Sequence, residues 1–195
     1  TPRNIPASWV GGEPSANVST FRLAFGNGTF VIYCNNGPVL ISTDGINWTG
    51  YSTGTDASKS YATLCFGNGV FLASAGREYQ TSTDGITWSA VITAPSGFSL
   101  SYVQWHDGLD LFVSTSNGGK VFTSPDGTNW TDVSISGSTP TLYSSAYNSS
   151  DSTLFVFSAY SFYNNYKSTD AGVTWEEVPN ELNQTKAIYA NGQYL

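Results

Sequence analysis

The sequence predicts an all-β chain folded as a single β-propeller region over residues 1–195, built of four-stranded antiparallel blades. Three observations predict this class. Aromatic residues make up 15% of the chain and charged residues only 11%, which suits many short strands joined by tight turns. Two landmarks recur in step about every forty residues, and no segment keeps a helical period beyond a turn or two. Repeats of this size form units that bury their apolar faces against their neighbours.

The first landmark is a polar turn that ends in tryptophan. It reads STDGINW at 42–48, STDGITW at 82–88, SPDGTNW at 124–130 and STDAGVTW at 168–175, and the PASW segment at 6–9 keeps only the tryptophan. The second landmark follows each tryptophan and reads AFGNGTF at 24–30, CFGNGVF at 65–71, QWHDGLDLF at 104–112, AYNSSDSTLF at 146–155 and IYANGQY at 188–194. Two landmarks in step define one repeating unit.

Within one unit the sequence alternates between apolar and polar residues, as strands do. Residues 20–25 predict a first strand, and the GNG that follows predicts a tight hairpin. Residues 29–34 and 38–43 predict the second and third strands, and 46–50 open a fourth after the Asp-Gly turn. Four antiparallel strands per repeat predict a propeller blade. A β-solenoid is the alternative, but its coils are shorter and lack four hairpin-like turns.

The units divide the chain into segments of about 40–45 residues. We expect blades at 19–50, 59–90, 100–132 and 141–178, the fourth strand of a preceding or closing blade at 1–15, and the start of a further blade at 185–195. Joined around a ring, the two ends would make a blade without its third strand, which would leave backbone groups unpaired. We therefore expect the propeller to be incomplete at the C-terminus, or its ring to be closed by something outside this chain.

The copy at 168–175 matches the pattern S-x-D-x-G-x-T-W in full. In this it resembles the Asp-box (BNR-like) repeat of sialidases, xyloglucanases, sortilin-type receptors, a photosystem assembly factor and many phage virion proteins. The other three copies are one residue shorter between Asp and Gly, which resembles a variant common in phage proteins. The resemblance implies a propeller with boxes between the third and fourth strands, away from the usual active site. It does not imply one activity, because the box occurs on proteins with unrelated functions.

The box itself is interpreted as structural rather than catalytic or metal-binding. The Asp carboxylate accepts hydrogen bonds from amides of its own turn, the Gly provides the backbone geometry, and the Trp is expected to be buried beneath the turn. A calcium loop would need several spaced oxygen ligands, which no copy provides. We expect no metal and no cofactor. The structural residues are Ser42, Asp44, Gly45, Trp48, Ser82, Asp84, Gly85, Trp88, Ser124, Asp126, Gly127, Trp130, Ser168, Asp170, Gly172 and Trp175.

The sequence gives little support for catalysis, and no catalytic residue is assigned. FRLA at 21–24 resembles the sialidase F-R-I-P motif, but the chain holds only three arginines, so an arginine triad would use all of them. Glu78 and Asp110 are candidates for a carboxylate pair of the glycosidase type, although nothing singles them out. His106, the one histidine, is expected to be an exposed turn residue. The sequence leaves enzymatic activity undecided and favours its absence.

The net charge limits the classes of partner that we expect, and the two cysteines limit the possible disulfides. The net charge of −7 and pI near 4.3 disfavour nucleic acid, and no apolar run is long enough to insert into a membrane. Cys34 and Cys65 are expected to be buried free thiols, with a single bridge as the alternative.

The resemblance and the composition together favour a non-enzymatic structural or adhesive propeller, part of a phage tail, fibre or surface protein. It would be virion-borne or extracellular and contact other virion or surface proteins, or cell-surface glycans. The alternatives are a sialidase-like glycan-binding or glycan-hydrolysing propeller and an assembly-factor scaffold. The expected binding face gathers exposed aromatic and amide side chains from the loops opposite the boxes. Its residues are Tyr51, Arg77, Glu78, Tyr79, Tyr160, Phe162, Tyr163, Asn164 and Asn165.

Overall fold

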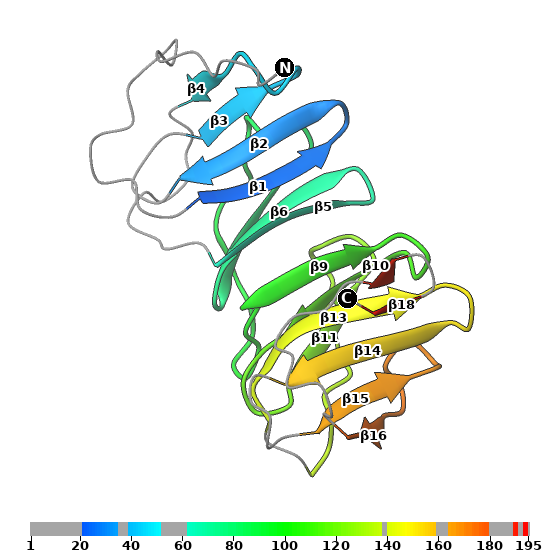
Figure 1. Cartoon of the computed structure of the whole chain (residues 1–195). Helices are drawn as coiled ribbons and strands as arrows, with labels where there is room; N and C mark the ends of the chain where they lie inside the picture. Colours follow the sequence, from blue (N-terminus) through cyan, green and yellow to red (C-terminus); the bar gives the residue numbers. More distant parts are fainter. Residues whose placement is uncertain are drawn as a thin grey trace.

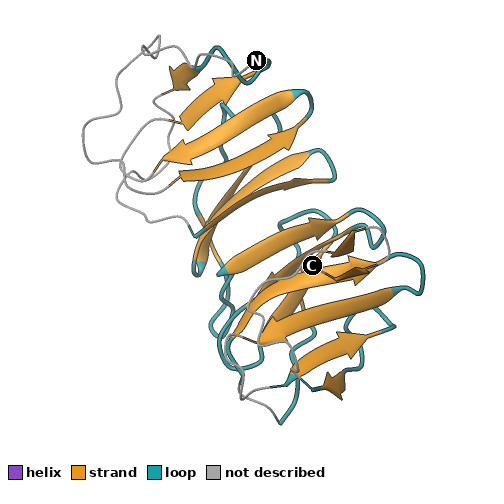
Figure 2. Cartoon of the chain, in the orientation of Figure 1, coloured by secondary structure: helices purple, strands orange, loops and turns teal. Residues whose placement is uncertain are grey.

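The structure is a computed structural model that describes residues 21–34, 39–51, 62–137, 140–158, 164–179, 189–190 and 193–194. Within these ranges the chain forms strands, turns and loops and contains no helix (Figure 2). The strands are β1 (Phe21–Gly26), β2 (Thr29–Cys34), β3 (Val39–Ser42), β4 (Thr49–Tyr51), β5 (Thr63–Gly67), β6 (Val70–Ala75), β7 (Glu78–Ser82), β8 (Ile92–Thr93), β9 (Tyr102–His106), β10 (Leu111–Thr115), β11 (Val121–Ser124), β12 (Thr131–Asp132), β13 (Leu142–Asn148), β14 (Thr153–Ser158), β15 (Asn165–Ser168), β16 (Glu176–Val178), β17 (Tyr189–Ala190) and β18 (Gln193–Tyr194).

These strands form four antiparallel sheets of four consecutive strands each, which we call blades 1 to 4. Blade 1 holds β1–β4, blade 2 β5–β8, blade 3 β9–β12 and blade 4 β13–β16, while β17 and β18 form a separate hairpin. The predicted all-β class and the four-stranded antiparallel blades are therefore confirmed. The fourth strand of blade 1 begins at Thr49, three residues later than expected. The reason is that the N–H groups of Ile46 and Asn47 bond to Asp44 instead of to a neighbouring strand.

The blades follow one another through their first strands. β5 packs between β1 and β9, β9 packs on β13, and β17 lies against β13 (Figure 1). Each first strand ends at a hairpin, and the third strand of the same sheet ends beside it at the Ser-x-Asp turn. We call this end of the blades the turn end. The opposite end, with the turns between second and third strands and the links between blades, is the connector end.

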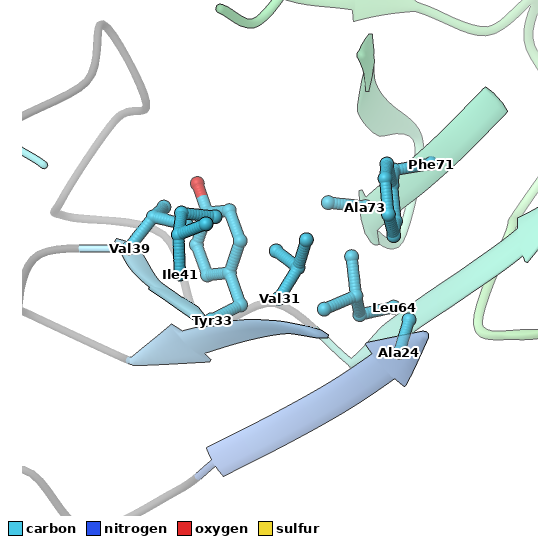
Figure 3. Close-up of a cluster of buried hydrophobic side chains, with 8 residues drawn as sticks. All are labelled: Ala24, Val31, Tyr33, Val39, Ile41, Leu64, Phe71 and Ala73. Atoms are coloured by element: carbon cyan, nitrogen blue, oxygen red, sulfur yellow. The ribbon is translucent and has the colours of Figure 1, made fainter. Parts of the chain in front are cut away.

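The hydrophobic core lies between blades rather than within one sheet, and we call each interface a seam. At the seam between blades 1 and 2, Val31 and Tyr33 of β2 meet Leu64 and Phe71 of blade 2 (Figure 3). The next residue of β6, Leu72, packs into the following seam with Phe112 of blade 3. Alternate residues of a strand thus face different seams, which explains why β6 is buried along most of its length.

Glycines let the first strands approach closely at the turn end. A Cβ on Gly26 would lie 2.1 Å from the Phe66 ring of the next blade, and a Cβ on Gly67 would lie 2.1 Å from the Trp105 ring. At the third seam the contact is looser, because a Cβ on Gly108 would lie 2.8 Å from the Tyr147 ring. One aromatic ring per seam therefore covers the backbone of the preceding blade.

The connector end is held by backbone bonds from the links to the turns of the blade they leave. The N–H of Leu100 donates to the Gly76 carbonyl at 2.7 Å, and that of Leu142 donates to the Ser116 carbonyl at 3.2 Å. Both leucine side chains are completely buried. Blades 2–3 and 3–4 are therefore joined by links that are themselves part of the core.

Candidate functional site: the repeated turns and the connector end

The Ser-x-Asp turns of blades 1 to 3 share one hydrogen-bond network. In blade 2 the Ser82 hydroxyl donates to Asp84 Oδ1 at 3.0 Å and accepts the N–H groups of Asp84 and Gly85 at 3.3 and 2.8 Å. Asp84 Oδ1 also accepts the N–H groups of Ile86 and Thr87 at 2.8 and 2.7 Å. The Asp44 and Asp126 turns repeat this pattern. The Ser hydroxyl and the Asp carboxylate thus serve the turn itself, whereas the carbonyls of Thr83 and Pro125 accept the side-chain amides of Asn27 and Asn68 from the preceding blade at 3.3 and 3.0 Å.

The turn of blade 4 contains one more residue, and its network changes. Ala171 takes a left-handed conformation with φ 59°, and the Ser168 hydroxyl still accepts the Gly172 N–H, at 2.8 Å. Asp170 Oδ1 now accepts the backbone N–H of Thr174 at 2.8 Å, and Oδ2 accepts the Thr174 hydroxyl at 2.6 Å. The threonine hydroxyl thus takes the place of the Asn47 and Asn129 amides, which donate to Oδ2 of Asp44 and Asp126 at 2.7 and 2.6 Å, while Oδ1 of Asp170 accepts one backbone donor fewer.

The glycines place these turns against the preceding blade. Gly85 has φ 76°, and a Cβ there would lie 2.5 Å from Val31 Cγ2 of blade 1. A Cβ on Gly127 would lie 3.1 Å from Leu72 Cδ1 of blade 2. A Cβ on Gly172 would lie 3.0 Å from Val133 Cγ2 beside blade 3. These glycines are required both by the left-handed backbone and by the close approach across the seam.

The tryptophans also serve the seams. The expectation that they are buried is wrong, but the indoles of Trp88 and Trp130 do lie at their own turns, donating to the Gly85 and Gly127 carbonyls at 2.9 and 3.3 Å. Trp48, Trp88, Trp130 and Trp175 are all half-buried. Trp88 packs edge-on against Tyr33 of blade 1 with ring centroids 5.7 Å apart, and Trp130 does the same with Tyr79 of blade 2 at 6.5 Å. The rings of Trp88 and Trp130 thus contact the preceding blade, whereas Trp48 contacts Phe30 of its own blade with centroids 6.3 Å apart.

The four turn carboxylates are held in the charged form. Backbone N–H donors, from Asn47 at Asp44 and from Thr87 at Asp84, lower the pKa of these carboxyls below the ordinary range. At Asp126 partial burial opposes this effect, but hydrogen bonds from Asn129 still lower the pKa. At Asp170 the Thr174 hydroxyl and N–H lower the pKa to about 2. A carboxylate that already accepts several donors is poorly placed to act as a general acid or base.

The structure places only part of the expected binding face in solvent at the connector end. Arg77 is exposed, Tyr51 and Glu78 are half-buried, and Asn164 is exposed beside Glu177, to which its amide donates. Tyr79 is only 3% exposed, and its hydroxyl donates to the Thr128 carbonyl at 3.1 Å. Its expected role as an exposed binding residue is therefore wrong, because strand alternation turns it into the seam.

Asn165 is likewise buried, since its side-chain oxygen accepts the Ser158 N–H at 3.0 Å and closes the turn between β14 and β15. Tyr160, Phe162 and Tyr163 lie outside the described residues. The expected face is thus reduced to Tyr51, Arg77, Glu78 and Asn164 among the residues that the structure describes.

The candidate catalytic groups do not converge. Glu78 begins β7 at the connector end, whereas Asp110 lies in the hairpin between β9 and β10 at the turn end. His106 is not an exposed turn residue: it is the last residue of β9, half-buried, with Nε2 2.8 Å from the Ser145 hydroxyl of blade 4. Burial lowers the pKa of His106 to about 4, against an opposing effect of Asp107.

The arginines within the described ranges support the links between blades. Arg22 Nε donates to the Ala62 carbonyl at 2.7 Å, and Arg77 Nη2 and Nε donate to the Ala94 carbonyl at 2.7 and 3.3 Å. The thiol of Cys65 is free and half-buried, and the Cys34 side chain lies outside the described residues. No group of three metal-ligating side chains occurs among the described residues, and none of their segments is a helix suited to crossing a membrane.

Sequence reasoning missed one pair of rings at the connector end. Tyr102 and Tyr143, from the starts of β9 and β13, lie edge to face with centroids 4.7 Å apart. The repeat gives a signal for Tyr102 alone, which occupies the position of Arg22 and Thr63. The blade 4 residue at that position is Ser144, and Tyr143 lies one residue earlier, where the register between β13 and β14 shifts.

Known proteins share the fold without close sequence similarity. No family model matches the chain, and no curated protein matches it by sequence. A virginiamycin B lyase from Staphylococcus aureus is 11% identical with a TM-score of 0.68, over 88% of this chain and 60% of the lyase. YCF48 bound to D1 peptide is 20% identical with a TM-score of 0.63, over 85% and 56%. The Niastella koreensis GH74 enzyme is 19% identical with a TM-score of 0.55, over 83% and 30%.

These structures are β-propellers, and this chain spans about 60% or less of the length of each. Their different activities, a lyase, a peptide-bound protein and a GH74 enzyme, show that the shared feature is architecture. The chain therefore has a β-propeller fold.

Proposed function

We propose that this chain is a non-enzymatic structural and adhesive β-propeller, carried on a phage particle as part of a tail, fibre or surface protein. Its partners are other virion or surface proteins and cell-surface glycans, and its place is the virion or the extracellular space. Low charge, many Gly residues and a net charge of −7 support a surface role that excludes nucleic acid.

One observation carries the non-enzymatic part of the proposal. The side chains best suited to chemistry are used to hold blades together: Arg22 and Arg77 bind link carbonyls, and His106 pairs with Ser145 across a seam. The turn carboxylates accept donors from their own backbone. Catalytic groups in contrast need free reach to a substrate in a cleft.

The repeated Ser-x-Asp turns support the assignment to the Asp-box class named above. Their hydrogen bonds fix each turn, and their glycines contact the preceding blade, so a box of this kind is a device for joining blades. Such a device suits particle proteins that must stay folded outside a cell. It carries no information about the ligand.

The function is tested on two fronts. Peptides of this chain are expected in highly purified phage particles from its source, at a constant ratio to the major tail proteins across a density gradient. The purified protein is expected to release no fluorophore from 4-methylumbelliferyl sialoside or β-glucoside. Turnover that disappears in an Arg22→Ala variant would instead establish the sialidase-like alternative, and absence from particles would overturn the virion assignment.

A further inference from the structure

Tyr102 and Tyr143 differ from the other tyrosines whose side chains the structure describes. Five of those tyrosines belong to a hydrophobic cluster or pack against one; they are Tyr33, Tyr51, Tyr79, Tyr147 and Tyr166. Tyr102 and Tyr143 belong to none of these clusters, and both are half-buried. Core packing therefore does not explain why two large rings meet at this place.

Tyr102 also departs from the repeat at its position. In blade 1 the equivalent Arg22 donates to the Ala62 carbonyl, and in blade 2 Thr63 Oγ1 donates to the Val103 carbonyl at 3.2 Å. Each of these side chains reaches the backbone that leads into the next blade. At blade 3 the same position presents an aromatic ring to a second aromatic ring, with an interplanar angle of 62°. At blade 3 a contact between two rings takes the place of the hydrogen bond to a backbone carbonyl.

The location suits a ligand site. Tyr102 and Tyr143 lie at the connector end, at the starts of the first strands of blades 3 and 4, where both side chains are half-buried. Burial, and then Tyr143, raise the pKa of Tyr102, and the charge of Arg22 opposes this effect more weakly. The Tyr102 hydroxyl is therefore neutral at physiological pH and can donate or accept a hydrogen bond.

We propose that Tyr102 and Tyr143 form a subsite for one pyranose ring of a neutral glycan. Aromatic faces stack on the apolar face of a sugar, and phenol hydroxyls bond to its hydroxyl groups. A neutral sugar fits better than an acidic one because the chain has a net charge of −7 and the Nε donor of Arg22 is used by Ala62. This subsite rests on the adhesive function proposed above and names its ligand class.

The test uses the whole chain with tyrosine rings labelled with ¹³C, titrated with cellohexaose, maltohexaose and chitohexaose, and with sialyllactose as an acidic probe. At least one neutral hexasaccharide is expected to shift the Tyr102 and Tyr143 ring signals. Tyr102→Ala and Tyr143→Ala are expected to weaken its binding tenfold or more, whereas Tyr102→Phe, which keeps the ring, loses only a few-fold. Phe25→Ala is the matched control, since Phe25 is an exposed aromatic near the turn end of β1 and lies outside the expected binding face, and it should bind normally.

Several results would overturn the subsite. These are no shift with any neutral hexasaccharide, equal binding by Tyr143→Ala and the parent, and binding confined to sialyllactose that 0.5 M salt abolishes. If Tyr143→Ala fails to fold, as judged by its thermal transition, the Tyr102→Phe and Tyr143→Phe titrations decide. A chain that is found in phage particles but binds no sugar here would refute this subsite while leaving the proposed function intact.

Discussion

The Ser-x-Asp turns of blades 2 and 4 differ in length by one residue. Comparing them shows which contacts form the turn and which attach it to the neighbouring blade. In blade 2 the Trp88 indole N–H donates to Gly85 of its own turn at 2.9 Å. In blade 4, where Ala171 is inserted, the Trp175 indole donates to the Val133 carbonyl of the preceding blade at 2.7 Å. Both turns keep the Ser hydroxyl and Asp carboxylate network. The inner network forms the turn, and its Gly and Trp attach it to the neighbouring blade.

The three seams also differ from one another in the contacts between the first strands of their blades. The first two are closed by Phe66 on Gly26 and Trp105 on Gly67, which are apolar contacts. The third places His106 against Ser145, whose N–H donates to Gln104 Oε1 at 2.8 Å. The third seam is therefore polar and contains the only histidine of the sequence.

The largest expected effect separates the second seam from the third. Gly67→Ala should destabilise the protein by about 3 kcal/mol or more, because its Cβ would overlap the Trp105 ring. Gly108→Ala should cost less, since the nearest Tyr147 atom is 2.8 Å away and lies on a side chain. Urea unfolding measures both. Gly28→Ala is the control for backbone strain alone, at about 1 kcal/mol, because φ is 72° and no atom is within 4 Å. Equal costs at Gly67 and Gly28 would contradict the seam contact.

Acid should act first on the third seam. The folded pKa of His106 is lowered to about 4 from an ordinary 6.5, so its neutral form is fully accommodated above pH 6.5. Stability should fall by up to about 1.4 kcal/mol per pH unit as pH drops from 6.5 to 4 and then level off for this group. Thermal transitions of the parent and of His106→Gln check this, and the variant should show a flatter profile in that window.

The turn carboxylates act at lower pH. Their folded pKa values are lowered, so their contribution is present above pH 4 and is lost as pH falls towards 2. The histidine prediction has its own contradicting outcome. If the dependence of stability on pH between 6.5 and 4 is the same in His106→Gln as in the parent, the third seam is not the acid-sensitive element.

The indole bond of blade 4 should be worth about 1 kcal/mol. Trp175→Phe removes the donor to Val133 and should loosen the third seam, whereas Trp88→Phe removes a bond within one turn. Hydrogen exchange is expected to quicken on both sides of the seam in Trp175→Phe, and only within the 82–88 turn in Trp88→Phe. Identical local patterns would remove the distinction between the two turns.

The smallest expected effect is a gain. Ala171 holds φ 59°, a conformation that costs an alanine roughly 1 kcal/mol. Ala171→Gly should therefore raise the free energy of unfolding by several tenths of a kcal/mol, after the entropy lost by glycine is counted. Chemical denaturation measures it, with Ala90→Gly as the control, since Ala90 is exposed and is not among the residues with positive φ. A loss of stability would show that the inserted residue is not strained.

Much of the blade was predictable because its signals are local. Strand alternation and GNG hairpins predicted 29–34 as a strand, as found for β2, and the Asp-Gly turn predicted where β3 ends. The start of β4 was misplaced because the carboxylate of Asp44 takes donors that a strand would use. Alternation along β7 does not show which of its two faces enters a seam, so the burial of Tyr79 was not predictable.

The seam contacts were not predictable from one repeat. Gly85 meets Val31, and His106 meets Ser145, only because two blades pack in a particular register, which no local pattern encodes. The contacts of Trp88 with Tyr33 and of Trp130 with Tyr79 have the same origin, because both join two blades.

The central claim, that each repeated turn joins its blade to the preceding one, is tested most directly by a double-mutant cycle across the first seam. A Cβ on Gly85 would lie 2.5 Å from Val31 Cγ2. Gly85→Ala should therefore cost about 3 kcal/mol in the parent, and at least 1 kcal/mol less in a Val31→Ala background, where the opposing methyl groups are gone. Additive costs, within about 0.5 kcal/mol, would contradict the claim and leave the turns as internal features of single blades.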